Sequence, residues 1–452
     1  MRQAGCAALG STGLVGALSN LQMLRGAVNI PSAMAAPGDF KALVCIFLFG
    51  GNDSNNLIIP RDTTGYQQYA QARQELTVPQ SELLAIHPRN TDGREWALHP
   101  NVPEMHSLFN AGKLAFLCNV GTLVAPVTRA AYLSKSAALP PQLFSHNDQQ
   151  VHWQTSRPDA VKRIGWAGRM ADLLNAANEN AQISMSISLN NNNVLQVGQT
   201  VMPYQISTSG PKGLSFHSNS RGQARRDAVM QILEQSYDHL FAQEHSNIAL
   251  RADAAHDTVE AALASAPETT SGVWPEESRL AQQLQMVAKL ISAHANLNQR
   301  RQTYFCSLGG WDTHGDQLED HPYLLAELSA CLQAFYSTME ELNLGDKVTT
   351  FTASDFGRTH TTNGDGSDHG WGGHHLIMGD AVNGGDFYGQ MPNLAIEGPD
   401  DTKKGRWIPT VSVDEYSATL ARWFGVPESD LSYVLPNLGR FATPDLGFMQ
   451  AG

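Results

Sequence analysis

The stretch that decides the predicted fold is FLFGGNDSNNLIIP, residues 47–60. It continues the apolar run ALVCIFLF (42–49), turns at two glycines and presents one acid, Asp53, among small polar residues. A short apolar run that stops at Gly-Gly is typical of a central strand of a parallel sheet, buried on both faces. In open α/β folds, ligands bind at the carboxyl ends of such strands, where glycine allows a tight turn. A plain strand-end turn capped by Asn and Asp is the alternative.

Other segments repeat this pattern, with helical sequence between several of them. One helical segment occupies 322–342, where leucines recur on one face. Strands that alternate with helices predict an α/β fold with a mostly parallel central sheet flanked by helices. The segment QISMSISLNNNN (182–193) alternates with period two, which predicts a half-exposed strand in an added hairpin. The further strand-like runs are KLAFLCNVG (113–121), TYFCSLGG (303–310), KVTTFTAS (347–354) and HHLIMGD (374–380).

Size and composition indicate a globular protein that does not bind nucleic acid. The chain has 452 residues, of which 42% are hydrophobic and 16% charged. Its net charge of -13, without a run of Lys or Arg, argues against a nucleic-acid partner. After the N-terminal region, no run reaches the roughly 18 apolar residues of a membrane span, so we expect no stable membrane insertion. We expect one domain over residues 37–452, with a helical insertion at about 221–300.

The N-terminal segment has the composition of an export signal. Residues 1–36 are small, apolar and poor in acids, and Ala33-Met34-Ala35 matches an A-x-A cleavage site. The RQAG sequence near the start is similar to the end of a twin-arginine signal. Because the second arginine is absent, we expect the signal to be truncated at its start. An apolar N-terminal helix is the alternative. The protein is therefore predicted to be periplasmic or secreted.

Acids and imidazoles follow the predicted strands in four separate segments. Turn chemistry explains Asp-Gly and Asn-Gly pairs, but it does not explain why His and Trp recur in the same loops. Carboxylates and imidazoles together suit a divalent cation such as Zn, Mn, Mg or Ca. The sequence therefore predicts a metal site at this edge of the sheet. The candidate residues are Asp53, Asp312, His314, Asp316, Asp355, Asp365, Asp368, His369, His374 and His375.

Three motifs carry a family resemblance, and they occur in a fixed order. FGGNDSNNLIIP, GGWDTHGDQ and SDFGRTHTTNGDGSDHGWGGHHLIMG resemble the secreted bacterial family called domain of unknown function 1501. That family is similar to the alkaline phosphatase/sulfatase superfamily. The resemblance implies an α/β sandwich with one or two divalent metals at the strand ends, beside a nucleophile. The ligands it implies are Asp53, Asp312, His314, Asp355 and His369.

The sequence departs from the superfamily pattern at two places. Asp312 and His314 are two residues apart, whereas the corresponding pair in phosphatases is separated by four. No histidine follows Asp355 directly, although phosphatases usually have an Asp-His pair there. These departures bear on whether the site holds two metals.

The resemblance also points to a nucleophile near the segment SHNDQQVHWQTS, residues 145–156. Ser145 is the candidate, and a plain helix cap with Asp148 in a capping box is the alternative. Thr122, Thr128 and water are the other candidates. Arg358 is a candidate for binding a phosphate or sulfate group, or else for pairing with a nearby acid. No C-x-P-x-R or S-x-P-x-R sequence occurs, so the modified-cysteine nucleophile of sulfatases cannot form.

Two functions from different classes fit these features. The first is an exported metal-dependent hydrolase of phosphate or sulfate esters, acting on a small-molecule or glycan ester. The second is a non-catalytic exported protein that retains the fold and binds a cell-envelope glycan or a secreted partner. The clustered ligand-type residues favour the enzyme, whereas the departures from the superfamily pattern favour the binding protein. The sequence predicts neither the substrate nor the oligomeric state.

Overall fold

A nine-stranded sheet forms the centre of the protein. The computed structural model describes residues 39–91, 93–160, 164–178, 183–213 and 219–450, and the predicted export signal lies outside them. Five neighbouring strands run parallel, and β12 runs antiparallel between β9 and β5. The order is β13 (Phe387–Gly389), β5 (Leu114–Gly121), β12 (Gly373–Met378), β9 (Val348–Ser354), β1 (Lys41–Leu48), β8 (Arg301–Leu308), β6 (Ser186–Ser188) and β7 (Tyr204–Gln205), with β14 (Val411–Ser412) paired to β5.

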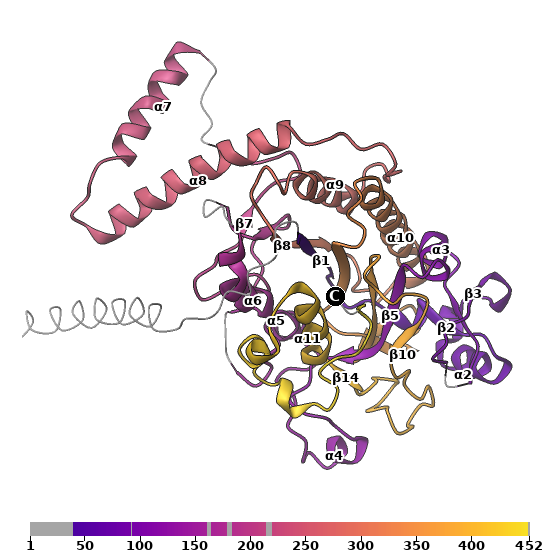
Figure 1. The fold of residues 1–452 in the computed structure, drawn as a ribbon. Helices are drawn as coiled ribbons and strands as arrows, with labels where there is room; N and C mark the ends of the chain where they lie inside the picture. Colours follow the sequence, from indigo (N-terminus) through magenta and orange to yellow (C-terminus); the bar gives the residue numbers. More distant parts are fainter. Residues whose placement is uncertain (1–38, 92, 161–163, 179–182, 214–218, 451–452) are drawn as a thin grey trace, which may run out of the picture.

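Helices cover both faces of this sheet, as Figure 1 shows. Alternate residues of β1 point to opposite sides. Val44 and Ile46 belong to the core beneath α3 (Pro103–Asn110), α9 (Arg279–Ser292) and α10 (Gln317–Glu341). Cys45 and Phe47 belong to the core beneath α5 (His146–Thr155), α6 (Trp166–Leu174) and α11 (Val413–Phe424). The predicted α/β class, a largely parallel sheet between helical layers, is confirmed.

The register of the parallel strands sets where their carboxyl ends lie. Leu48 of β1 pairs with Leu308 of β8 on one side and with Ser354 of β9 on the other. The segments that follow these three strands therefore leave the sheet at the same edge. Gly50, in the turn after β1, has a φ of +120°, and a Cβ there would lie 2.4 Å from the backbone nitrogen of Asp312. Glycine is needed at this position because the β1 turn packs directly against the loop after β8.

The β1 turn and the loop after β9 lead into smaller elements near this edge. The loop after β9 forms a hairpin of β10 (Arg358–Thr362) and β11 (Ser367–His369), in which Arg358 pairs with His369. The helix α2 (Thr63–Arg73) packs against β10. A separate three-stranded sheet consists of β2 (Ile58–Pro60), β4 (Trp96–Leu98) and β3 (Leu84–Ile86). Two further short helices are α4 (Arg129–Leu133) and α12 (Leu431–Val434).

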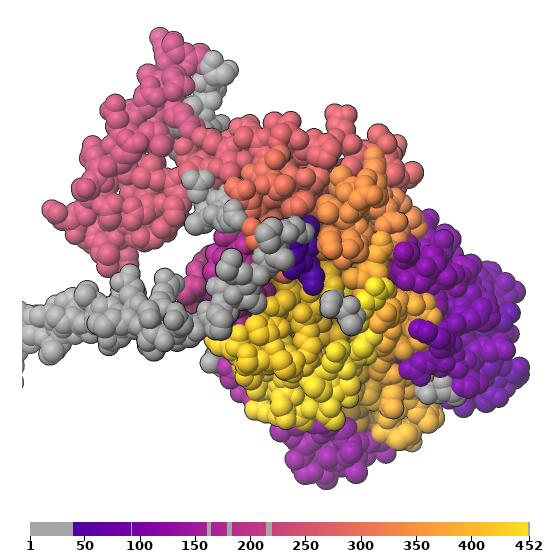
Figure 2. All heavy atoms as spheres, in the orientation of Figure 1, coloured from indigo at the N-terminus to yellow at the C-terminus, as the bar shows by residue number. Residues whose placement is uncertain are grey.

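The helical region expected at about 221–300 has two parts with different surroundings. The helix α7 (Ser220–Leu233) and the first part of α8 (Leu240–Ala264) form an arm that extends from the body in Figures 1 and 2, whereas Ala255, Val259 and Ala262 near the end of α8 lie in the core. In contrast, α9 is part of the body, and Leu280, Leu284 and Val287 lie in the core. None of the helices in the described ranges is both long enough and apolar enough to cross a membrane.

The period-two segment at 182–193 differs from its prediction. Only Ser186–Ser188 form a strand, β6, and this strand pairs in parallel with β8 inside the central sheet. All three residues are buried, so the segment is not a half-exposed hairpin strand. Alternation between Ser and Ile or Met suggested a polar face, but small serine side chains fit inside the sheet layers when they find hydrogen-bond partners. Ser188 does so, because its hydroxyl donates to the carbonyl of Asn191 at 2.7 Å.

Candidate metal centre

Three side chains from distant segments converge at the carboxyl edge of the sheet. His146 is the first residue of α5, Asp312 lies in the loop after β8, and His369 ends β11. One ligand atom from each lies within 4.8 Å of the others. His146 Nε2 is 3.4 Å from Asp312 Oδ2, and His369 Nε2 is 3.3 Å from Asp312 Oδ1. The sequence predicted two of these three residues.

The second nitrogen of each imidazole in this group faces an acceptor. His146 Nδ1 is 2.6 Å from Asp355 Oδ2, and His369 Nδ1 is 2.8 Å from the carbonyl oxygen of Phe144. Since a carboxylate and a carbonyl only accept hydrogen bonds, each Nδ1 carries the proton. In the neutral imidazoles, the Nε2 lone pairs then point to the same place as the Asp312 carboxylate.

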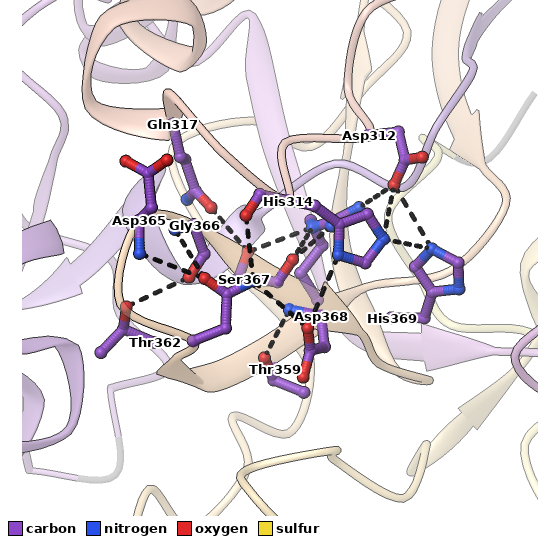
Figure 3. A network of polar contacts seen from close by, with 12 residues as sticks. Asp312, His314, Gln317, Thr359, Thr362, Asp365, Gly366, Ser367, Asp368 and His369 are labelled. Atoms are coloured by element: carbon purple, nitrogen blue, oxygen red, sulfur yellow. Dashed lines mark hydrogen bonds and ion pairs between the residues drawn. The ribbon is translucent and has the colours of Figure 1, made fainter.

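His314 lies beside this group, as Figure 3 shows. Its Nε2 is 2.8 Å from His369 Nε2 and 3.2 Å from Asp312 Oδ1. Its Nδ1 faces Asp368 Oδ1 at 3.5 Å. His314 and Asp312 are both 45% exposed at the side chain, so solvent reaches this side of the cluster.

The donor set fits a divalent cation. Imidazole nitrogens and a carboxylate are the ligands that Zn²⁺ and similar ions take. Ligand atoms bound at about 2.0–2.2 Å around a tetrahedral ion lie about 3.3–3.5 Å apart. Here His146 Nε2 and His369 Nε2 lie 3.4 and 3.3 Å from the Asp312 carboxylate oxygens, and one ligand atom from each of the three residues lies within 4.8 Å of the others. Without a cation, the electron-rich atoms would face each other. With three protein ligands, a fourth position is left for substrate, as in catalytic zinc sites.

Charges and burial shift the pKa values of Asp312 and His369 toward the ionised carboxylate and the neutral imidazole, the forms that bind metal ions. Burial by itself would raise the pKa of Asp312, but the hydrogen bond and charge of Arg358 outweigh it and lower this pKa. Burial lowers the pKa of His369, which keeps its imidazole neutral.

Asp355 lies behind His146 and does not belong to the converging group. Its side chain is fully buried, and Gln150 Nε2 also donates to its Oδ2 at 3.0 Å. Burial raises its pKa, while the hydrogen bonds from Gln150 and His146 oppose this effect. A carboxylate that holds the far nitrogen of a ligand histidine is a frequent partner in metal sites, because it fixes the tautomer and orientation of the ring.

The structure places Asp53 at the predicted edge but gives its carboxylate other partners. Asp53 Oδ2 accepts from Arg73 and from Gln317, and the side chains of Asp53 and Arg73 are both fully buried. Burial by itself would raise the pKa of Asp53, but the charge of Arg73 together with the nearby His321 and the hydrogen bonds from Gln317 and Arg73 outweighs it, and this pKa falls to about 2. The cation beside Asp53 is therefore a guanidinium of the chain itself.

Arg358 is also occupied inside the protein. Its side chain is fully buried. Its Nη1 donates to the carbonyl of Gly50 at 3.0 Å and to Asp312 Oδ1 at 2.9 Å, and its Nε donates to the carbonyl of Ser367 at 3.1 Å. The guanidinium thus joins the β1 turn, the loop after β8 and strand β11. Of the two roles considered from the sequence, these contacts favour pairing with an acid.

The candidate hydroxyls have distinct surroundings. Ser145 precedes α5, directly before His146, and its Oγ donates to Asp148 Oδ2 at 2.6 Å. It does not accept from the Asp148 backbone, so the expected capping box is not formed. Thr122 is buried and donates to Gln149 Oε1 at 2.6 Å. Thr128 caps α4, where its Oγ1 accepts from the nitrogen of Ala131.

His146 is the member of the cluster that the sequence analysis did not identify. It lies in the segment SHNDQQVHWQTS, directly after Ser145, the residue that was predicted as the nucleophile. A histidine in the first turn of a helix is unremarkable by pattern alone. Its position only becomes informative once α5 is known to start at the edge where β1, β8 and β9 end.

Among solved structures, the chain is similar to several proteins at low identity. The chain is similar to the crystal structure of Ps i-CgsB, with 9% identity, a TM-score of 0.36 and coverage of 87% of this chain and 74% of that one. It is also similar to the crystal structure of the lipoteichoic acid synthase LtaP from Listeria monocytogenes, with 9% identity, a TM-score of 0.36 and coverage of 88% of this chain and 78% of that one. The PsFucS1 sulfatase from Pseudoalteromonas sp. has 11% identity and a TM-score of 0.34, and the similarity covers 97% of this chain and 76% of that one. These similarities are too distant to carry function to this chain.

The comparisons of the sequence with curated proteins and with family models have different outcomes. No curated protein matches the chain. The family model described as "Protein of unknown function (DUF1501)" matches residues 40–434, which is most of the chain. The resemblance seen in the three motifs is confirmed, and the chain belongs to the DUF1501 family.

Proposed function

We propose that this protein is an exported, divalent-metal-dependent hydrolase of phosphate or sulfate esters. The observation that carries the proposal is the convergence of His146, Asp312 and His369, whose ligand atoms lie within 4.8 Å of one another. His314 lies beside this group, 2.8 Å from His369 Nε2, and is not counted among its three ligands. A divalent ion bound there supplies a Lewis acid for the ester oxygen.

The surrounding residues support a single ion at this place. Asp53, which the family resemblance implied as a ligand, is neutralised by Arg73. A second cation at Asp53 would have to displace a buried guanidinium. Asp355 and Phe144 orient the two imidazoles, and Arg358 orients Asp312. We therefore expect one ion for each chain.

Ser145 is the hydroxyl best placed to act as the nucleophile. It is adjacent to His146 in the chain, and its proton already points to the Asp148 carboxylate at 2.6 Å. A carboxylate in that position can accept the proton as the serine oxygen attacks, which is how weak hydroxyl nucleophiles are activated. Thr122 donates to an amide oxygen, which is a much weaker base than a carboxylate.

The test combines metal analysis with an activity assay. The purified protein should contain about one equivalent of a divalent ion and should hydrolyse an aryl phosphate or an aryl sulfate. The variant His146→Ala should lose both the ion and the hydrolysis. His245→Ala, on the exposed part of α8, is the matched control and should keep both. Wild-type protein that binds no divalent ion would refute the proposal.

One observation favours the non-catalytic alternative. The buried Arg358 donates to backbone carbonyls and to Asp312, so it does not face outward toward an anionic ester group. A protein that binds its ion at full occupancy, yet hydrolyses neither ester class over a broad pH range, would be the exported binding protein.

The export part of the proposal rests on the composition of residues 1–36. We expect mature protein in the periplasm or the medium to lack residues 1–36. Sequencing of the N-terminus of protein taken from the producing cell measures this directly, and a mature protein that starts at Met1 would contradict it.

A further inference from the structure

A second feature at the carboxyl edge of the sheet is a cleft of about 810 Å³. It lies at the ends of β8, β6 and β7, on the side away from β9. Ser307, Leu308 and Gly309 form one part of it. The loops after β6 and β7, the start of α9 and Glu327 of α10 form the rest. Its volume lies within the range of ligand sites, roughly 300–1,000 Å³.

The side chains that line the cleft are mostly neutral and polar. Amides and hydroxyls come from three different elements. Asn191 lies after β6, Thr208 lies after β7, and Gln282 lies in α9. The four charged residues balance in sign, since Lys212 and Arg279 stand with Glu277 and Glu327. None of the described residues that line it is aromatic.

This lining matches a ligand with many hydroxyl groups and little net charge. Amides both donate and accept hydrogen bonds, so they can pair with a hydroxyl in either orientation. A strongly anionic ligand would be expected to meet an excess of Lys and Arg, and an apolar ligand would meet a hydrophobic lining. The described lining residues show neither an excess of Lys and Arg nor a mainly hydrophobic character.

The cleft and the metal centre share strand β8. Gly309 lines the cleft, and Asp312 of the metal centre follows three positions later. Gly309 and Gly310 are exposed, so the segment of chain that leads from the cleft toward Asp312 carries no bulky side chain before the buried Trp311. A chain-like ligand that occupies the cleft can therefore extend toward the cluster.

From these observations we infer that the cleft binds an oligosaccharide, and that the ester hydrolysed at the metal centre is carried by that sugar chain. The cleft holds the sugar through neutral hydrogen bonds, and the His146 group acts on the ester. The second half of this inference rests on the proposed function, whereas sugar binding by the cleft stands independently of it.

Binding is tested on the full chain after removal of divalent ions with a chelator. The probes are tetrasaccharides of glucose, galactose and N-acetylglucosamine, each in neutral and monosulfated form, measured by isothermal titration calorimetry. At least one probe should bind the wild-type protein. The double variant Asn191→Ala/Gln282→Ala should weaken that binding by about tenfold or more, because it removes hydrogen bonds from two walls. Both residues are exposed, so the fold should be retained.

Matched variants separate this inference from the proposed function. Gln235→Ala, at the exposed end of the α7–α8 arm, should bind the probe as the wild type does. The double variant should keep its metal content and its hydrolysis of an aryl ester. His146→Ala should lose the metal and still bind the sugar. The inference is overturned if no probe binds the wild type at millimolar concentration, or if the double variant binds as tightly as the wild type.

Discussion

The Nδ1 atom of His146 lies 2.6 Å from Oδ2 of Asp355, although 209 positions separate the two residues in the sequence. This contact joins the start of α5 to the end of β9. It sets the proton on Nδ1 and directs Nε2 toward Asp312. Asp355 thus acts on the proposed metal through the orientation of a histidine.

The variant Asp355→Asn should therefore bind the ion more weakly without losing it altogether. Loss of such a partner typically lowers metal affinity by about 10–100-fold. Competition with a chromophoric chelator measures the change. Asp365→Asn, an exposed aspartate in the neighbouring β10–β11 loop, is the matched control. Equal affinities for the wild type and Asp355→Asn would show that the contact has no positioning role.

The buried pair of Asp53 and Arg73 should matter for stability more than for metal binding. In Arg73→Met, the Asp53 carboxylate keeps its burial but loses its cation, which should cost about 3–5 kcal/mol of unfolding free energy. Arg61→Met removes an exposed ion pair with Glu95 and should cost about 1 kcal/mol or less. Urea denaturation compares the two. If Arg73→Met keeps wild-type stability but binds a second divalent ion, Asp53 is a metal ligand after all.

Burial of Asp414 should make the stability of the fold decrease as the pH rises from about 4 to about 7. Asp414 lies in the first turn of α11, and burial raises its pKa from 3.8 to about 7. The folded state thus keeps this proton to higher pH than the unfolded state. Its contribution to stability is complete below pH 3.8 and is lost as the pH rises through about 7.

The melting temperature should therefore fall between about pH 4 and pH 7, and Asp414→Asn should reduce that fall. Asp445→Asn, an exposed aspartate near the C-terminus, should leave the profile unchanged. Identical pH profiles for the wild type and Asp414→Asn would mean that Asp414 does not titrate in this range. The experiment is performed on metal-free protein so that the ion does not contribute.

Ser145→Ala tests the nucleophile. It should abolish hydrolysis of the aryl ester while metal content stays at the wild-type level, because the serine is not part of the ligand group. Ser134→Ala, an exposed serine at the end of α4, should be fully active. Full activity in Ser145→Ala would transfer the role to Thr122, Thr128 or water, and Thr122→Ala would be the next variant to measure.

Much of the architecture could be predicted from the sequence because buried parallel strands have a strong local signature. ALVCIFLF ends at Gly-Gly, and TYFCSLGG and KVTTFTAS follow the same pattern, so β1, β8 and β9 were found within a residue or two. With these strands assigned, the position of Asp312 and Asp355 at the carboxyl edge of the sheet could be predicted as well.

The partners of each side chain could not be predicted in the same way. A carboxylate after a strand has the same sequence appearance whether its cation is a metal ion or an arginine. Asp53 is paired with Arg73, 20 residues later in α2, and nothing local distinguishes this from a ligand role. His146 was missed for the converse reason, because its proposed ligand role depends on where α5 starts relative to a sheet formed by residues far from it.

The spacing of the ligand residues along the chain has a consequence for how the protein is assembled. His146, Asp312 and His369 come from segments that only meet once β1 has paired with both β8 and β9, and these strands are separated by more than 250 positions. Contacts of such long sequence separation form slowly. No early folding intermediate built from local structure would contain the site. An ion at the proposed site would therefore enter a sheet that is already paired, and the compartment in which the chain completes its folding would determine which ions are available to it.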